Sequence, residues 1–163
     1  MITTNSKLRS LQYSIVHRFF CCKYNLHLWN IVECPDCLYC NQVDTLEHYF
    51  YYCEQSRGMW KQVEKIAYCA LGLKINFAVL EVLLGIPCKK YTPHHIMNLL
   101  ILFTKQFIYS QKREENIVLP TLLHRSLAKR CEIEIYLLNT NLDTHDFFLK
   151  EWKNVHTFIS SLL

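Results

Sequence analysis

Apolar residues recur every three or four positions along most of the chain, which is the spacing of an amphipathic α-helix. The pattern predicts an all-α fold, with a small loop inserted after the first helices. The predicted helices cover residues 7–20, 25–29, 55–71, 77–84 and 93–113, a segment that begins at Pro120, and a last segment that Asp143 or Thr144 caps. The side chains expected to face the core in the first and last helices are Leu8, Leu11, Ile15, Phe19, Phe147, Phe148, Trp152 and Phe158.

Several helix boundaries are marked by particular residues. Pro93 and Pro120 are placed at helix starts, where the missing backbone N–H costs no hydrogen bond. Asp44 and Thr45 are suited to cap a short helix, because their side-chain oxygens can accept from its first free N–H groups. Residues 114–119, between two long predicted helices, are the best candidate for a hinge.

One short stretch in the inserted loop has the spacing of a metal site. Cys37 and Cys40 form a Cys-x-x-Cys pair, seven residues separate Cys40 from His48, and four separate His48 from Cys53. Zinc prefers four such ligands in a tetrahedron. On an ideal helix His48 and Cys53 would point about 140° apart, at about 100° per residue, so the helix must end or turn before Cys53. The sequence therefore predicts a structural Zn²⁺ ion on these four side chains.

Two alternatives to this ligand set remain open. Cys34 and Cys37 form a second, overlapping Cys-x-x-Cys pair, and all of these groups could also be free thiols with a surface histidine. The Cys37/Cys40 pair is favoured because Asn41 follows it directly. Asn tolerates the left-handed backbone conformation that closes such a turn.

The composition fits one compact globular unit in a reducing compartment. The chain has 163 residues, 51% of them apolar, and a net charge of +4. No apolar run approaches the roughly 20 residues of a membrane span, and the polar, basic start of the chain has no apolar signal core. Nine cysteines, an odd number with four in a zinc pattern, favour free thiols over disulfides. We expect no membrane contact and an intracellular location, nuclear or cytoplasmic.

Basic residues gather on two predicted helices. Lys105 and Lys112 share one face of the first helix with Tyr109, Arg113 follows Lys112 directly, and Arg125 and Lys129 share one face of the second helix. Such faces could hold the phosphates of RNA or single-stranded DNA, with Tyr109 or a tyrosine among residues 49–52 as a stacking surface. The alternative is an ordinary solvated face beside core aromatics, because a charge of +4 permits nucleic-acid binding without requiring it.

Residues 37–60, CLYCNQVDTLEHYFYYCEQSRGMW, resemble the zinc-binding segment downstream of the reverse transcriptase in LINE-type (non-LTR) retrotransposon polyproteins. That segment runs Cys-x-x-Cys, a polar turn, an acidic-Thr-x-x-His run, an aromatic residue, Cys and a later Trp. In this chain those later places are filled by Asp44-Thr45-Leu46-Glu47-His48, Phe50, Cys53 and Trp60. The similarity is specific over residues 37–60 and looser over nearly all the rest of the chain.

The resemblance implies three segments that form one compact unit: N-terminal helices (1–33), the zinc-binding segment (34–60) and a helical extension (61–163). It implies a fragment of a polyprotein that carries an endonuclease and a reverse transcriptase upstream. The expected partners are that upstream reverse transcriptase domain and RNA or single-stranded DNA, contacted during target-primed reverse transcription. The alternative is a domesticated protein-interaction module in which zinc is purely structural.

Enzymatic activity is not expected of the fragment itself. The residues contain no Tyr-x-Asp-Asp polymerase motif and no His-Glu-x-x-His motif. Zinc deaminases need His-x-Glu ahead of Pro-Cys-x-x-Cys, whereas here Glu47 directly precedes His48 and both follow the cysteine pair. Four protein ligands would also leave the zinc ion no open position for a substrate.

Overall fold

A computed structural model describes residues 5–140 and 146–163, and these residues are mostly helical. The elements are α1 (Ser6–Val16), α2 (Lys23–Leu28), the π-helical turn η1 (His48–Tyr52), α3 (Glu54–Leu71), α4 (Val79–Leu84), α5 (Pro93–Arg113), α6 (Pro120–Thr140) and α7 (Asp146–Ser160). Within the described residues there is no strand, and a single isolated bridge pairs Asp36 with Val43. The predicted all-α class is therefore confirmed. No helix in this part of the chain has both the length and the apolarity that crossing a bilayer requires.

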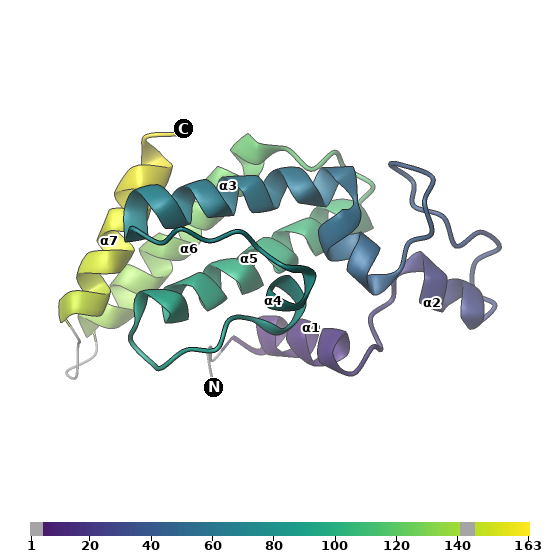
Figure 1. The fold of residues 1–163 in the computed structure, drawn as a ribbon, viewed down its shortest axis with the longest axis horizontal. Coiled ribbons are helices and arrows are strands. Elements are labelled where there is room, and N and C mark those ends of the chain that lie inside the picture. The colour runs from purple at the N-terminus through teal and green to yellow at the C-terminus, as the bar shows by residue number, and fades with distance from the viewer. Residues whose placement is uncertain (1–4, 141–145) are drawn as a thin grey trace.

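The helix α5 lies at the centre of the molecule, between α3, α6 and α7 on one side and α1 and α4 on the other (Figure 1). Side chains from nearly every face of α5 are buried, including Ile96, Leu100 and Ile108. Trp152 of α7 and Leu127 of α6 complete this core, and neither side chain is exposed. Burial of large apolar side chains, each contributing about 1.5–3 kcal/mol, is what holds these helices together.

The first helix ends earlier than its pattern predicts, which changes the residue that enters the core. The helix stops at Val16, and Arg18 takes the left-handed conformation with φ 57°. The chain reverses there, so Phe19, expected inside, is 62% exposed, whereas Phe20 is only 3% exposed. Phe20 packs edge-on against Tyr49, with ring centroids 4.8 Å apart.

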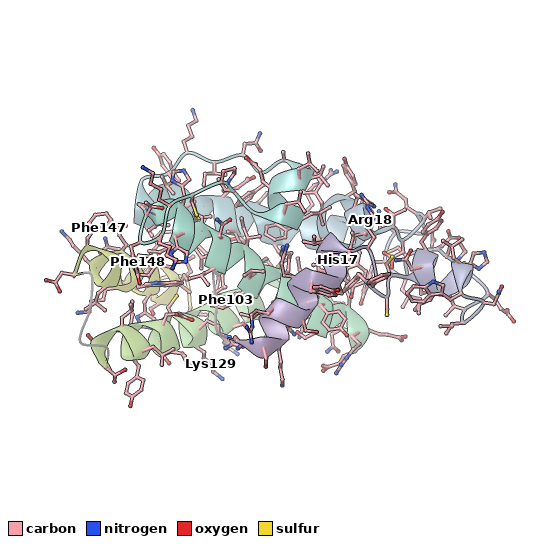
Figure 2. All side chains as sticks on the ribbon, turned by 90° about the horizontal axis from the view of Figure 1, so that it is seen from below. His17, Arg18, Phe103, Lys129, Phe147 and Phe148 are labelled. Atoms are coloured by element: carbon pink, nitrogen blue, oxygen red, sulfur yellow. The ribbon has the colours of Figure 1, made fainter. Side chains whose placement is uncertain are left out.

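The last helix also differs in one position from its prediction. Phe147, expected in the core, is 55% exposed, whereas Phe148 is buried beside Trp152 (Figure 2). Consecutive helical side chains point about 100° apart, so the two phenylalanines cannot both face α3 and α6.

The predicted caps of the last helix, Asp143 and Thr144, lie outside the described residues.

The short helix α2 and the loop that follows it lie at one end of the molecule, away from α7 at the other (Figure 1). No residue of α2 is buried. Its first N–H groups are capped from a distance, because Lys23 N donates to the Asp44 carboxylate at 3.2 Å and Tyr24 N donates to Asp44 O at 3.3 Å. Asp44 thus caps α2 rather than the turn that carries His48, and it ties α2 to the loop of the predicted metal site.

Candidate metal centre

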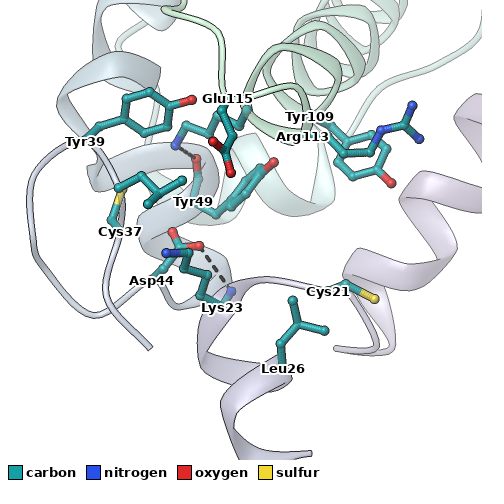
Figure 3. Close-up of a pocket in the computed structure, with 12 residues that line it drawn as sticks. Cys21, Lys23, Leu26, Cys37, Tyr39, Asp44, Tyr49, Tyr109, Arg113 and Glu115 are labelled. Atoms are coloured by element: carbon teal, nitrogen blue, oxygen red, sulfur yellow. Dashed lines mark hydrogen bonds between the residues drawn. The ribbon is translucent and has the colours of Figure 1, made fainter. Parts of the chain in front are cut away.

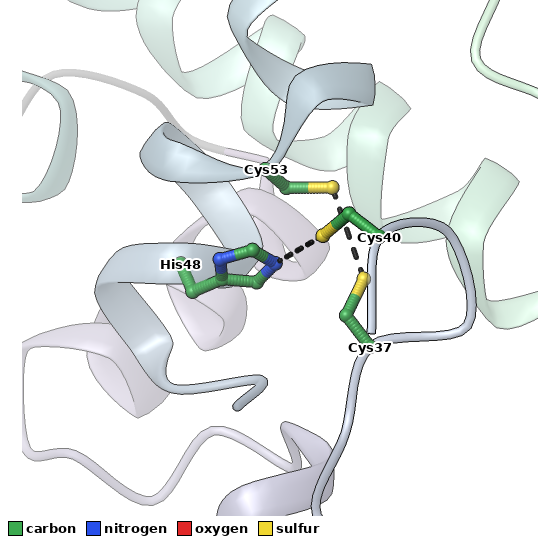
Figure 4. Close-up of side chains that lie close together, drawn as sticks. All are labelled: Cys37, Cys40, His48 and Cys53. Carbon is green, nitrogen blue, oxygen red and sulfur yellow. Dashed lines mark hydrogen bonds between the residues drawn. The ribbon is translucent and has the colours of Figure 1, made fainter. Parts of the chain in front are cut away.

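The four predicted ligands come together at one point (Figure 4). The ligand atoms of Cys37, Cys40, His48 and Cys53 all lie within 4.8 Å of one another. Cys37 Sγ is 3.8 Å from Cys53 Sγ, and Cys40 Sγ is 3.2 Å from His48 Nε2. Sulfurs about 2.3 Å from a tetrahedral zinc ion lie about 3.8 Å from one another, so the spacing fits a metal ion of this kind. The cluster can hold a metal ion.

A tight turn presents the two cysteines of the pair on the same side. Cys37 N donates to Gln42 O at 2.7 Å, and Asn41 N donates to Cys37 O at 3.0 Å. Asn41 has φ 56°, the left-handed conformation predicted for it. Cys34 lies outside the cluster: its thiol is exposed and donates to the Asp36 carboxylate at 3.3 Å. The structure therefore favours the Cys37/Cys40 pair over the overlapping Cys34/Cys37 pair.

A single π-helical turn brings His48 and Cys53 to the same side. Thr45 Oγ1 caps the start of this turn by accepting from His48 N at 3.1 Å. Cys53 N then donates to His48 O at 2.9 Å, a bond between residues five apart. One wide turn of this kind places residue 53 beside residue 48, where an α-helical turn would pair residues four apart. The chain turns extended at Cys53 (φ −59°, ψ 134°) before α3 begins, which confirms that the helix had to change before Cys53.

The surroundings of the cluster shift the pKa values of its groups in different directions. Burial lowers the pKa of His48, which keeps the imidazole neutral as a metal ligand requires. Burial raises the pKa of the Cys37 thiol to about 12. Burial opposes ionisation of Cys53 as well, but the charge of Lys112 and a hydrogen bond from it outweigh this effect, so the pKa of Cys53 is lowered. A bound metal ion would ionise the thiols outright.

Two lysines predicted to contact phosphates are instead buried, so that part of the sequence prediction is wrong. Lys105 is 1% exposed, and its ammonium donates to Leu83 O at 3.0 Å and to the Gln12 side chain. Lys112 is 7% exposed and donates to Tyr49 O at 2.8 Å. The reason is the central position of α5, whose polar positions are covered by α1, α4 and the π-helical turn.

The other predicted phosphate contacts lie at the surface. Arg113 is exposed at the end of α5, and Arg125 and Lys129 are exposed on α6, where Figure 2 labels Lys129. The tyrosines expected to stack on bases differ among themselves: Tyr49 is buried, whereas Tyr52 is half exposed. Whether any of these side chains contacts nucleic acid stays a prediction.

A pocket of about 320 Å³ lies between the metal loop, the start of α2 and the end of α5 (Figure 3). Three tyrosines line it, Tyr39, Tyr49 and Tyr109, together with the cations Lys23, Lys112 and Arg113 and the acids Asp44 and Glu115. Sequence reasoning singled out neither Tyr39 nor Lys23, because the residues they face come from distant parts of the chain. In the sequence, Tyr39 is marked only by its position within the Cys37/Cys40 pair, and Lys23 only by its position at the start of a short helix.

None of the protein-family models, curated proteins or solved structures with which the chain was compared matches it. The metal centre therefore rests on the geometry of its own four side chains.

Proposed function

We propose that the chain holds one structural zinc ion on Cys37, Cys40, His48 and Cys53. Three thiolates and one imidazole at the corners of a near-tetrahedron are the ligand set that zinc prefers among common metals. The clustering of the four ligand atoms within 4.8 Å of one another, with a 3.8 Å sulfur–sulfur distance, is the observation that carries this proposal. Four protein ligands leave no open position for substrate, so the zinc ion stabilises the loop and performs no chemistry.

Metal analysis of the purified, reduced chain tests this assignment with a matched pair of cysteine variants. One zinc ion per chain is expected for the wild-type protein and for Cys34→Ser, whose thiol is exposed and outside the cluster. Cys40→Ser should lose the ion or bind it far more weakly. A folded wild-type chain without metal, or loss of metal from Cys34→Ser and not from Cys40→Ser, would contradict the ligand set.

The role of the zinc-stabilised module, in this proposal, is to contact RNA or single-stranded DNA, as the resemblance to LINE-type reverse transcriptase proteins implies. The pocket beside the metal centre supports this role. Tyr39 and Tyr109 offer aromatic surfaces there, and Arg113, 5.8 Å from the Tyr109 ring, is an exposed cation. Single-stranded nucleic acids are bound by this combination of stacking surfaces and positive charge.

Fluorescence anisotropy with a labelled oligouridine, at increasing salt, tests this role. Loss of one phosphate contact should make the plot of log affinity against log salt shallower by about 0.7 for a single strand. Arg113→Gln should show this change, whereas Lys150→Gln, an exposed cation of α7 at the opposite end of the molecule, should not. No binding at low salt, or equal behaviour of the two variants, would contradict the role.

One observation favours a second candidate function, a protein-interaction module. Large apolar side chains are exposed on α2 and the loop after it, among them Leu28, Trp29, Ile31 and Leu38. Such an apolar surface is typical of a site that another protein covers. On the same resemblance, the partner would be the upstream reverse transcriptase domain. Retention of a co-expressed LINE-type reverse transcriptase domain by the wild-type chain, and its loss with Trp29→Ser, would favour this second function.

A further inference from the structure

Lys112 occupies an unusual position behind the metal ligands. It belongs to the last turn of α5, yet its ammonium is buried and donates to Tyr49 O at 2.8 Å. The ammonium also lies 4.6 Å from the centre of the Tyr49 ring and 5.8 Å from the centre of the Tyr39 ring. Burial raises the pKa of the nearby Cys53 thiol, and the charge of Lys112 acts in the opposite direction and lowers it.

Such a buried cation is costly unless a negative group lies near it. Moving an ammonium out of water costs several kcal/mol, and neutral carbonyls and aromatic rings offset only part of that cost. Among the described residues, the ion pairs join Arg18 with Glu47 and His156 with Glu132, and neither includes Lys112. The groups around it that can carry a full negative charge are the thiols of Cys53 and Cys37 and the carboxylates of Asp44 and Glu115, and neither carboxylate forms an ion pair with Lys112.

The metal centre has the complementary charge. Three thiolates and a neutral imidazole around a divalent ion leave one net negative charge. We propose that Lys112 is the counter-cation of the metal centre: its ammonium donates to the Cys53 thiolate and neutralises the excess charge of the Cys₃His site. This inference rests on the proposed zinc site and deepens it, because it links the metal loop to the central helix α5. Groups that donate to metal ligands in this way usually change metal affinity by about 10- to 100-fold when they are removed.

The chain provides a matched control in Lys105. This lysine lies about two turns earlier on the same helix and is equally buried. Its ammonium bonds to a backbone carbonyl, as that of Lys112 does, but its second partner is the amide oxygen of Gln12, and it is not among the residues that surround the four clustered ligand atoms. A general effect of removing a buried lysine would appear in variants of both Lys105 and Lys112. A specific effect on zinc affinity should appear only in variants of Lys112.

Zinc competition with a chelator of known affinity measures the contribution of Lys112. Lys112→Gln carries no charge, and it should bind zinc about 10- to 100-fold more weakly than the wild-type chain. Lys112→Arg keeps the charge and should stay within a few-fold of wild type. Lys105→Gln should leave zinc affinity unchanged. In the cobalt-substituted protein, the sulfur-to-cobalt charge-transfer band should shift in Lys112→Gln and stay in place in Lys105→Gln, which a purely structural role would not produce.

The outcomes separate this inference from the zinc proposal. Wild-type affinity and an unshifted cobalt band in Lys112→Gln would overturn the role of Lys112 and leave the zinc site intact. A wild-type chain that holds no metal would overturn the zinc site itself. If Lys112→Gln does not fold, Lys112→Arg decides: zinc affinity close to wild type supports the counter-cation, and affinity at least tenfold weaker in a folded protein overturns it.

Discussion

Two regions of the molecule are stabilised in different ways. In the metal lobe, residues 23–44, the only buried side chains are Cys37 and Asp44. The first is one of the four clustered side chains that could hold a metal ion, and the second caps α2. In the helical body, which comprises α1 and α3 to α7, a continuous apolar core joins the helices. The comparison teaches that the body can fold by burying apolar surface, whereas the lobe depends on ligation and backbone hydrogen bonds.

The π-helical turn packs into the core of the body although it carries His48, one of the four clustered side chains. Phe50 is fully buried, and its carbonyl accepts a hydrogen bond from the Trp60 indole. Tyr49 packs on Phe20 and accepts from Lys112. The core therefore holds His48 and Cys53 in place. The other two side chains of the cluster, Cys37 and Cys40, belong to the lobe.

Removal of zinc should have the largest effect on stability, and this effect should be limited to the lobe. Structural zinc contributes on the order of 10 kcal/mol to the folding of small modules. After chelation, the amides of residues 30–44 should lose protection against hydrogen exchange, while those of α5 remain protected. Mass-spectrometric hydrogen exchange on the chelated and zinc-loaded chain measures this difference. Loss of protection throughout α5 would show that the two regions fold as one unit.

A core substitution should destabilise the body and leave zinc binding by the lobe unchanged. Leu100 is fully buried in α5, and Leu100→Ala should lower the free energy of unfolding by about 2–5 kcal/mol, because it leaves a cavity. Zinc stoichiometry should remain at one per chain. Urea unfolding gives the first quantity and metal analysis the second. Leu80→Ala, at an exposed position of α4, is the control and should change stability by less than about 0.5 kcal/mol.

The body should also respond to pH through Lys105. Burial lowers the pKa of this lysine from 10.5 to about 7. Between these values the unfolded chain binds the proton and the folded chain does not, so the contribution of Lys105 to stability rises with pH, by at most about 1.4 kcal/mol per unit. Below pH 7 both states are protonated and the full cost of the buried charge remains.

Comparison with Lys105→Met isolates this contribution. The gain in unfolding free energy from the methionine should be largest near pH 6 and should shrink as pH rises towards 10. Urea unfolding at several pH values measures it. A gain that does not vary with pH would mean that the lysine keeps its ordinary pKa in the folded chain.

The smallest effect is expected from Glu47→Gln. Glu47 lies next to His48 in sequence but forms a surface ion pair with Arg18 at 2.9 Å, in which Arg18 is exposed and Glu47 is partly buried. Exposed pairs contribute about 0–1 kcal/mol, so stability should change little. Zinc stoichiometry should not change at all, because Glu47 is not among the clustered ligand atoms. Metal analysis that finds less zinc in this variant would show that the ligand set is incomplete.

The sequence predicted the parts of the fold that depend on local signals. The clustering of Cys37, Cys40, His48 and Cys53 followed from their spacing, the left-handed Asn41 from its residue type, and the start of α5 from Pro93. The parts that depend on distant contacts could not be predicted. Lys105 resembles any surface lysine in sequence, because the acceptors that allow its burial lie on α1 and α4. Phe20 rather than Phe19 is buried because the chain reverses at Arg18, and the pattern of apolar residues does not predict this reversal.

The π-helical turn has a consequence for how this site can vary among sequences. Since the wide turn pairs residues five apart and an α-helical turn pairs residues four apart, deletion of one residue from the turn would turn His-x₄-Cys into His-x₃-Cys. If the turn also became α-helical, both ligands would still face the ion. Insertion of one residue has no such compensating helix and would rotate Cys53 away. A related sequence with His-x₃-Cys in an α-helical turn could therefore place its two side chains as His48 and Cys53 are placed here. Both spacings are compatible with this site.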